Sequence, residues 1–396
     1  MAGQELCVGG LPLGRLAARA GQTPFYAYDR GVIARRVAQL RQSLPAAIGL
    51  HYCIKTNPMP ALVGYLAGLV DGLDVASAGE LKLALDAGMA PRHVSFAGPG
   101  KREEELRQSV AAGVLVNVES VRELRQLADL SARTGWAARV AVRVNPDFEL
   151  KSSGMRMGGG AKPFGIDAEQ VPHVLAEIGA LGLRFEGFHV YAGSQNLRAE
   201  AIAEAQRQSW ALVLRLAAHA PAAVGSVNLG GGFGVPYFPG DRHLELAPIA
   251  ETLAGIAEEA ARCLPEARLV LELGRYLVAE AGLYVTRVVD KKVSRGRTFL
   301  VTDGGLHHHL AASGNFGQVV RKNYPIAVGT RMGQVPLQAT TVVGPLCTPL
   351  DLLGDQVALP DAEPGDLVAI FLSGAYGASA SPQGFLSHPP PVELLV

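Results

Sequence analysis

The sequence predicts a parallel (β/α)8 barrel followed by a mostly β C-terminal domain. Two observations lead to this α/β prediction. Between residues 31 and 275, short apolar segments alternate eight times with segments of helical periodicity, and after Arg275 the helical periodicity largely disappears. Such an alternation is typical of a closed parallel barrel. A doubly wound open sheet is the structural alternative, but the number of units and the chain length favour the barrel.

The elements of the predicted barrel follow one another at regular intervals. Helices are expected near residues 31–43, 59–69, 78–88, 101–112, 119–134, 167–180, 198–219 and 245–263. Strands are expected at residues 49–54, 73–75, 93–96, 114–118, 139–144, 185–190, 226–229 and 268–273. Residues 146–165 interrupt this rhythm with a Gly-rich loop that is too long for a neutral connection.

A second domain is expected outside the barrel. Strands are predicted at residues 283–290, 298–302, 340–343 and 367–371, with little helical periodicity between them. Residues 1–30 are expected to be loop-rich apart from a short strand at residues 23–28. We therefore expect a barrel domain at 31–275, and a β-rich domain made of 1–30 together with 276–396.

The composition excludes several classes of function. The 396 residues include 36 basic and 36 acidic side chains, so we expect no basic surface for nucleic acid or an anionic membrane. We find no signal peptide and no apolar run long enough to span a bilayer. The four cysteines lack Cys-x-x-Cys or zinc-type spacing. This pattern indicates a reducing, cytoplasmic location.

Catalytic groups of a barrel lie where its strands end, and polar residues gather at those positions. The segment from Leu50 to Pro58 is an apolar strand that closes on Lys55. This lysine either extends into solvent or acts as an amine whose desolvation lowers its pKa, and the segment alone leaves both interpretations open. The other strand-end candidates are Asp74, Ser77, Asn117, Arg143, His189, Tyr191, Gly230, Gly231, Gly232, Glu272 and Arg275.

Two of these strand ends suggest a ligand. Gly230-Gly231-Gly232 follows a strand, and consecutive glycines allow backbone N–H groups to surround a phosphate; a flexible turn would look the same. Glu272 and Arg275 place a carboxylate near a guanidinium, a pair that taken alone indicates a surface ion pair. Combined with Lys55, they describe pyridoxal phosphate: an amine, a phosphate cradle and a carboxylate that keeps a ring nitrogen protonated.

The sequence also resembles a known family over nearly its whole length. The motifs that carry this resemblance occur in the family's order, and they are Tyr52-Cys53-Ile54-Lys55-Thr56-Asn57, Asp74-Val75-Ala76-Ser77-Ala78-Gly79-Glu80, Gly193-Ser194-Gln195, Gly230-Gly231-Gly232, Glu272-Leu273-Gly274-Arg275, Gly344-Pro345-Leu346-Cys347 and Gly374-Ala375-Tyr376. They resemble the pyridoxal-phosphate-dependent decarboxylases of the alanine-racemase fold, which are the diaminopimelate and ornithine decarboxylases. Residues 151–160 and 306–318 resemble the exosortase-associated subgroup, which is similar to decarboxylases of carrier-linked amino acids.

The resemblance implies roles for the matching residues. Lys55 would bind the cofactor covalently, Glu272 would pair with the pyridine nitrogen, and Cys347 of a second subunit would return a proton to the substrate. This last role implies an obligate homodimer with shared active sites. The implied cofactor-binding set is Lys55, Asp74, Arg143, His189, Tyr191, Ser194, Gly230, Gly231, Gly232, Glu272, Gly274, Arg275 and Tyr376.

Three departures from the family pattern concern the substrate. Tyr191 stands where the family usually has a histidine stacked on the cofactor, and Thr348 stands where diaminopimelate decarboxylases have a glutamate. The segments 306–309 and 321–324 match poorly a grip for a distal carboxylate. We therefore expect an amino-acid substrate other than diaminopimelate, presented on an acyl carrier protein in the related subgroup. The candidate substrate contacts are Thr348, Asp351, His307, Arg321 and Tyr324.

Other functions remain open on the sequence alone. Adjacent histidines at 307–309 cannot all face one ion and have no carboxylate at ligand spacing, so we expect a polar active-site loop there and no metal. Amino-acid racemases of the same fold resemble proteins with an arginine at the pyridine nitrogen, so Glu272 and Cys347 favour decarboxylation. A non-catalytic, cofactor-carrying homologue would resemble a bare barrel, whereas this chain retains Lys55, Cys347 and a second domain.

Overall fold

The computed structural model describes residues 5–149, 155–156, 158–316, 318 and 320–396. Within it the chain divides into two compact units. The barrel unit comprises Arg36–Val235 and Arg242–Tyr276, and the β unit comprises Met1–Arg35, Pro236–Asp241 and Leu277–Val396. Each unit is considered by itself below.

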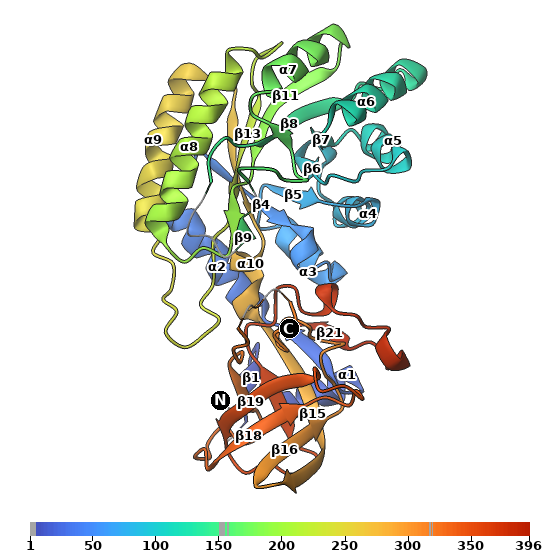
Figure 1. Ribbon diagram of the computed structural model, residues 1–396, viewed down its shortest axis with the longest axis vertical. Coiled ribbons are helices and arrows are strands. Elements are labelled where there is room, and N and C mark those ends of the chain that lie inside the picture. The colour runs from blue at the N-terminus through green and yellow to red at the C-terminus, as the bar shows by residue number, and fades with distance from the viewer. Residues whose placement is uncertain (1–4, 150–154, 157, 317, 319) are drawn as a thin grey trace. The chain divides into compact units, whose positions relative to one another are not determined.

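The barrel unit confirms the predicted parallel barrel. In order around the ring, its eight strands are β4 (Ile48–Cys53), β5 (Gly72–Val75), β6 (Val94–Phe96), β7 (Leu115–Val118), β8 (Arg139–Asn145), β11 (Arg184–Val190), β13 (Ser226–Gly231) and β14 (Arg268–Leu273). β14 pairs with β4, which closes the ring, and every pairing in it is parallel. All carboxyl ends of these strands therefore point to one mouth (Figure 1).

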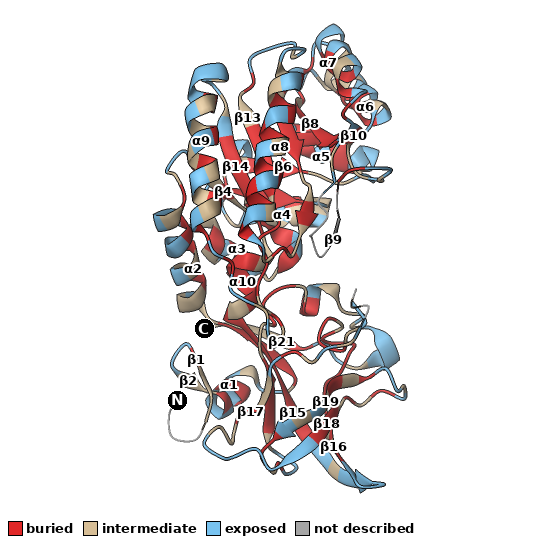
Figure 2. Ribbon diagram, turned by 60° about the vertical axis from the view of Figure 1, so that its left-hand side comes forward, coloured by how far each residue is buried: buried red, intermediate tan, exposed pale blue. Residues whose placement is uncertain are grey.

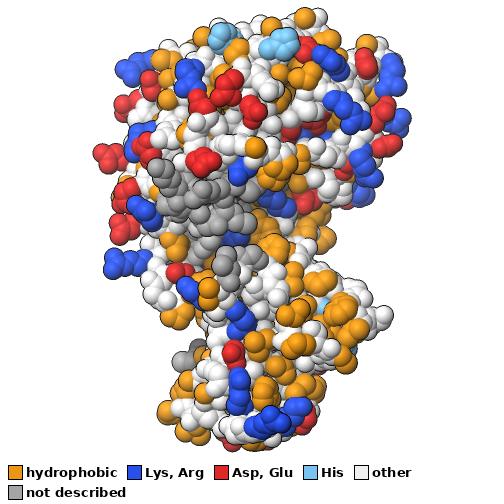
Figure 3. All heavy atoms as spheres, in the orientation of Figure 1, with side chains coloured by type: hydrophobic (Ala, Val, Ile, Leu, Met, Phe, Trp, Pro, Cys, Tyr) orange, Lys and Arg blue, Asp and Glu red, His pale blue; other side chains and the backbone are white. Residues whose placement is uncertain are grey.

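Helices surround the barrel, as the periodicity predicts. They are α2 (Arg30–Ser43), α3 (Pro60–Ala67), α4 (Ala78–Asp86), α5 (Glu103–Ala112), α6 (Val121–Thr134), α7 (Val171–Ala180), α8 (Ala199–Ala217) and α9 (Ala247–Cys263). Each packs a buried face on the sheet and exposes the other (Figure 2). On the face shown in Figure 3, basic and acidic side chains are interspersed over the outer helices.

Local capping explains where several of these helices begin and end. The hydroxyl of Ser77 accepts a hydrogen bond from the backbone N–H of Glu80 at the start of α4, and Ser120 does the same for Glu123 in α6. Gly113 and Gly135 end α5 and α6 in the left-handed conformation. Because these N-caps follow β5 and β7, they define the loops at the carboxyl mouth.

The β unit is organised around β15 (Gly282–Ser294). Its main sheet runs β17 (Ile326–Val328), β20 (Leu367–Ile370), β15, β16 (Arg297–Thr302), β18 (Gln338–Val343) and β19 (Leu352–Leu359). The predicted N-terminal strand is present as β3 (Phe25–Tyr28), which pairs with β15 and with β21 (Val392–Leu395). Phe25, Ala27 and Val285 belong to a buried core in this unit.

The N-terminal segment differs from the prediction, because it is not loop-rich. It contains a short hairpin of β1 (Cys7–Val8) and β2 (Leu11–Pro12), followed by α1 (Leu13–Ala20). Helix α1 has Pro12 at its N-cap and no side-chain capping bond, so the sequence lacks the usual start signal. Leu13 and Leu16 of this helix are fully buried in the core of the β unit.

The strands β17, β19 and β21 are also absent from the prediction. β19 mixes buried with exposed positions without strict alternation, and β21 is short and half-buried throughout.

Part of the Gly-rich loop forms β9 (Met155–Arg156), which pairs with β12 (Gly193–Ser194). Residues 151–154 and 157, on which part of the subgroup resemblance falls, lie outside the described residues. None of the helices described in the chain has the length and apolarity needed to cross a bilayer.

A glycine in β11 allows the barrel to close, and its replacement should be costly. Gly187 has a φ of +151° at a register shift between β11 and β8, and a Cβ there would lie 1.8 Å from the carbonyl oxygen of Ser226. We expect Gly187→Ala to lower the free energy of unfolding by about 3 kcal/mol, from strain plus overlap, measured by urea denaturation.

The matched control for this prediction is Gly182→Ala. Gly182 also has a positive φ, +65°, but a Cβ there meets nothing within 4 Å. Its replacement should cost only the left-handed backbone strain, about 1 kcal/mol. Equal losses for the two variants would contradict the steric argument.

Candidate active site

A pocket of about 150 Å³ opens at the carboxyl mouth of the barrel. Its lining residues come from successive strands and their following loops, as a barrel active site requires. They are Cys53, Lys55, Asp74, Val75, Ala76, Ala97, Gly98, Pro99, Arg143, Phe164, His189, Tyr191 and Glu272. The structure thus brings six of the predicted site residues into one cavity: Lys55, Asp74, Arg143, His189, Tyr191 and Glu272.

Lys55 follows β4 in a 3₁₀ turn, Ile54–Thr56, rather than forming the last strand residue. Its side chain is 46% exposed, so the amine has left the barrel core. Its Nζ nevertheless lies 3.8 Å from Oε1 of Glu272 and 5.7 Å from the centre of the Tyr191 ring. Both interpretations of Lys55, a side chain that extends into solvent and an amine that acts in the site, therefore hold in part. The amine is accessible to solvent, and it also lies near a buried carboxylate.

Glu272 lies in β14 and is buried with a full set of partners. Its Oε1 accepts from the Cys53 thiol at 3.1 Å, and its Oε2 lies 3.0 Å from Nε2 of His189 and accepts from Nδ2 of Asn228 at 3.3 Å. Burial alone would raise the pKa of Glu272, but the hydrogen bond and charge of His189, with the charge of Lys55, hold it well below its usual range. Glu272 is therefore an ionised carboxylate inside the barrel.

Asp74 at the end of β5 forms a second buried cluster. Its Oδ1 accepts from Ser95 at 2.7 Å and lies 3.0 Å from Nδ1 of His51. Burial lowers the pKa of His51, but the charge of Asp74 and its hydrogen bond raise it above the ordinary value. Gly72 makes room for the imidazole, since a Cβ there would lie 2.4 Å from Nε2 of His51.

Arg143 in β8 occupies another side of the pocket. Its Nη1 donates to Oε1 of Glu119 at 2.9 Å, and its guanidinium lies 5.3 Å from the centre of the Phe164 ring. Burial acts to raise the pKa of Glu119, but Arg143 and Lys101 lower it. Arg143 is thus held in a fixed position by a carboxylate behind it.

The glycines at the ends of β13 and β14 are required by close backbone approach. Gly230 and Gly232 have positive φ angles of +70° and +81°. A Cβ on Gly231 would lie 2.0 Å from the carbonyl oxygen of Glu272, and one on Gly232 would lie 2.3 Å from that of Gly193. Gly274 is equally constrained, because a Cβ there would lie 2.1 Å from Oγ1 of Thr56. This backbone approach places Gly232 beside β12, which carries Ser194.

These groups fit pyridoxal phosphate. The pocket supplies an accessible amine at Lys55 and an ionised carboxylate at Glu272, and Oδ2 of Asp74 is buried without a hydrogen-bond partner among the described residues. The glycine-lined backbone beside Ser194 would hold the phosphate, together with Arg275 at the start of α10 (Arg275–Val278). The fold and this donor set define a barrel that binds pyridoxal phosphate.

Several predicted residues lie in the β unit, and they form a separate group. Cys347 is exposed. Asp351 is buried, and its two carboxylate oxygens accept from the backbone N–H groups of Leu306 and Leu346 at 2.6 and 2.8 Å. Thr348 accepts from the N–H of Leu350 at 3.3 Å. Asp351 therefore joins the loop of Cys347 to the segment that precedes His307.

The histidine run is buried within the β unit rather than displayed as a polar loop. The imidazole of His307 has no hydrogen-bond partner among the described residues, and burial with the neighbouring His308 and His388 lowers its pKa to about 3. His309 lies 2.9 Å from the Ser373 hydroxyl, and burial lowers its pKa to about 3. The ring of His309 packs against Tyr26 and Tyr284, whereas that of His307 packs against His308 and His388. This tertiary packing overrides the polar character of the run.

The remaining candidates of the β unit have partners inside it. The guanidinium of Arg321 donates to the carbonyl oxygens of Ser313 and Leu352 and to the side chain of Asn323. Tyr324 is buried against Tyr237, with ring centres 4.9 Å apart. Tyr376 has a φ of +53° and lies 6.1 Å from the ring of Phe316. The substrate roles of Arg321 and Tyr324 stay predictions.

Residues that the sequence analysis missed support those it selected. His51 lies inside β4 and Asn228 lies inside β13, whereas Cys53 is the last residue of β4. The available signal was polarity at alternate positions of a barrel strand, since such positions face the interior. Lys101, Glu119 and Glu123 also escaped notice; Nζ of Lys101 lies 2.7 Å from Oε1 of Glu123 in a buried ion pair.

Comparisons with known proteins identify the family. Residues 30–279 match the model for the pyridoxal-binding domain of the pyridoxal-dependent decarboxylases. The chain is 40% identical over 380 residues to the L-glutamyl-[BtrI acyl-carrier protein] decarboxylase of Niallia circulans, covering 94% of this chain and 89% of that protein. It is 30% identical over 395 residues to the diaminopimelate decarboxylase of Aquifex aeolicus, covering 99% and 90%. The chain belongs to the pyridoxal-phosphate-dependent decarboxylases, and it is a carboxy-lyase of an amino acid or an amino-acid derivative.

A solved structure agrees with this assignment. Diaminopimelate decarboxylase from M. jannaschii in complex with L-lysine superposes with a TM-score of 0.87 at 25% identity, covering 100% of this chain and 92% of that chain. The similarity extends over both the barrel and the β domain.

The His51–Asp74 pair gives a pH prediction. The pKa of His51 is raised above 6.5 in the folded chain, so its stabilising effect is complete below about pH 6.5 and is lost as pH rises through the folded-state pKa. The loss of unfolding free energy in Asp74→Asn should therefore be largest below about pH 6.5 and shrink toward higher pH. Urea denaturation of the apoenzyme across this pH range measures it.

The control variant is Ser95→Ala, which removes the other hydrogen bond to Asp74 without removing a charge. Its destabilisation should be constant over the same pH range. A pH-independent loss in Asp74→Asn would show that His51 stays neutral in the folded protein.

Proposed function

We propose that this enzyme removes the α-carboxylate of an amino-acid unit that is attached to an acyl carrier protein. The observation that carries the chemistry is the buried, ionised Glu272, whose Oε1 lies 3.8 Å from the amine of Lys55. The support for the carrier comes from the relative at 40% identity, whose name specifies a glutamyl group on an acyl carrier protein. We further propose membership of the exosortase-associated subgroup, and a cytoplasmic location.

The cofactor, when bound, withdraws the electrons that carbon dioxide leaves behind. Lys55 would hold the cofactor covalently and be displaced by the substrate amine. Glu272 would keep the proton on the pyridine nitrogen, because an adjacent ionised carboxylate raises the proton affinity of that nitrogen. His189, Asn228 and Cys53 serve this role indirectly, by fixing both oxygens of Glu272.

The phosphate would be held by backbone and side chains around the carboxyl mouth. Gly231, Gly232, Ser194 and Arg275 would bind it from the barrel, and the resemblance to the family assigns Tyr376 the same role. Arg143 would lie beneath the ring, held by its bond to Glu119. Tyr191 would provide an aromatic face where the family usually has a histidine.

The β-unit residues support a substrate that differs from diaminopimelate. Thr348 stands in place of an acidic residue after the cysteine, so no carboxylate is supplied there to a distal amine. The donors of Arg321 bind Ser313, Asn323 and Leu352, and freeing them for a distal carboxylate would cost these bonds. A carrier-linked substrate has a thioester at its distal end and needs neither group.

We also propose a homodimer in which Cys347 completes the site of its partner. Cys347 is exposed, as a group that acts on another subunit must be. Two large apolar side chains lie near its loop, Leu350 at 59% and Phe316 at 42% exposure, and Asn315 reaches the carbonyl oxygen of Leu350. Exposed apolar residues of this kind are typical of contact surfaces.

The carrier proposal is tested by supplying the same amino acid in two forms. The holoenzyme is given free L-glutamate and L-glutamyl thioester on an acyl carrier protein, and an amino-acid panel extends each arm. We expect carbon dioxide release and a matching mass loss on the carrier only in the thioester arm. Efficient turnover of a free amino acid would refute the carrier requirement, and Lys55→Ala controls for non-enzymatic loss.

Replacing Glu272 by glutamine should affect turnover more than binding. The amide keeps the shape of the side chain but cannot hold the proton on the ring nitrogen, so kcat should fall by roughly a hundredfold with KM changed little. The control Glu258→Gln removes an exposed carboxylate from α9 and should leave both constants unchanged. An unchanged kcat in Glu272→Gln would remove Glu272 from the mechanism.

Shared active sites predict complementation between two inactive variants. Lys55→Ala and Cys347→Ala chains should each be inactive alone. After mixing with subunit exchange, half of the dimers pair one of each, and one site in each such dimer is intact, so about a quarter of wild-type activity should return. No recovery, despite exchange verified by mass spectrometry, would place Lys55 and Cys347 in the same chain's site.

A further inference from the structure

A second cavity lies at the opposite mouth of the barrel from the active site. Its volume is about 310 Å³, and it is lined by residues at the amino ends of the strands, including Ile48 of β4, Arg139 of β8 and Arg268 of β14. This end of a barrel is commonly filled by side chains and serves stability. Here it remains open, and we name it the basal cavity.

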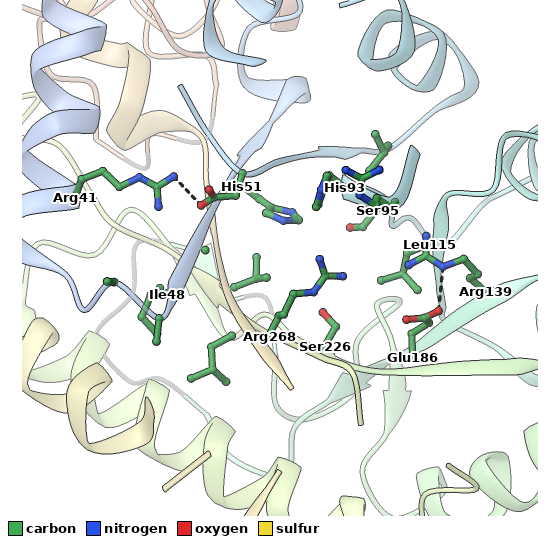
Figure 4. Close-up of a pocket in the computed structure, with 18 residues that line it drawn as sticks. Arg41, Ile48, His51, His93, Ser95, Leu115, Arg139, Glu186, Ser226 and Arg268 are labelled. Atoms are coloured by element: carbon green, nitrogen blue, oxygen red, sulfur yellow. Dashed lines mark hydrogen bonds and ion pairs between the residues drawn. The ribbon is translucent and has the colours of Figure 1, made fainter. Parts of the chain in front are cut away.

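The lining of the basal cavity is rich in arginine. Among the described lining residues, Arg41, Arg92, Arg139 and Arg268 face only two carboxylates, Asp71 and Glu186. Both carboxylates are already paired. Arg41 lies 2.6 Å from Asp71, and Arg139 lies 3.0 Å from Glu186. Figure 4 shows Arg41 on the opposite side of the cavity from the Arg139–Glu186 pair.

The other two guanidinium groups carry the excess charge. Within the described chain, neither Arg92 nor Arg268 has a carboxylate at ion-pair distance, and both are exposed to solvent. Figure 4 shows Arg268 in the centre of the ring of lining side chains, with Ser226 beside it. Burial of His93 lowers its pKa, and Arg92 and Arg268 lower it further, so both charges act on the same region.

We propose that the basal cavity binds a dianionic phosphate group between the guanidinium groups of Arg92 and Arg268. A planar guanidinium binds phosphate oxygens through two parallel hydrogen bonds, and two such groups match two negative charges. The hydroxyl of Ser226 is a further donor in the lining. The proposed donors Arg92, Ser226 and Arg268 lie at the amino ends of the strands, whereas the cofactor pocket opens at their carboxyl ends.

Calorimetric titration of the cofactor-loaded, full-length enzyme with inorganic phosphate tests this proposal. Loading the cofactor fills the phosphate site at the carboxyl mouth, and constant ionic strength removes general screening. We expect saturable binding of one phosphate per chain. The double variant Arg92→Gln/Arg268→Gln should weaken it at least tenfold, whereas Arg122→Gln, an exposed arginine of α6, should leave it unchanged.

A second arm identifies the source of the phosphate. Glycerol 3-phosphate that binds as tightly as inorganic phosphate would indicate a site for organic monoesters, and much weaker binding would indicate inorganic phosphate itself. No saturable binding in the wild type, or unchanged affinity in a folded double variant, would overturn the proposal. If the double variant does not fold, Arg268→Lys keeps the charge but loses the paired hydrogen bonds, and unchanged affinity there would also overturn it.

Discussion

The ionised carboxylate of Glu272 inside the barrel is the constraint on which the site depends. A buried charge is costly unless it has partners, and Glu272 acquires them from β4, β11 and β13 through Cys53, His189 and Asn228. These bonds need the strands to meet in one register around a closed ring. Closure in turn needs glycine where backbones come too close for a side chain, as at Gly187 and Gly231. The charge proposed to serve the cofactor is therefore maintained by the whole barrel.

Much of this fold could be predicted, because the alternation of periods in the barrel is long and regular. The eight strands and eight helices lie within a few residues of their expected positions. The β unit was harder, since β17 and β21 are short and β19 mixes buried and exposed positions without strict alternation. Helix α1 escaped prediction because it has no capping side chain. It is held instead by burial of Leu13 and Leu16, which the local sequence does not reveal.

In the candidate site, too, some residues could be predicted from the local sequence and others only from the folded structure. Lys55, Asp74 and Glu272 could be selected because they stand where predicted strands end. Of their supporting residues, Asn228 lies within β13 and Cys53 ends β4, and only the closed ring shows that both reach the same carboxylate. The buried His309 shows the opposite limit. A run of polar residues predicts exposure, and only packing against distant aromatic rings reverses that expectation.

The carboxylate of Asp351 has a consequence for how this enzyme can diverge. Because it binds the backbone of Leu306 and Leu346 rather than their side chains, the path of the Cys347 loop does not depend on which side chains the loop carries. The neighbouring position, Thr348, can therefore be exchanged while the cysteine remains in place. With the roles proposed above for Thr348 and Cys347, such an arrangement lets substrate choice change without loss of the reaction, and it makes Thr348 a starting point for redesigning specificity.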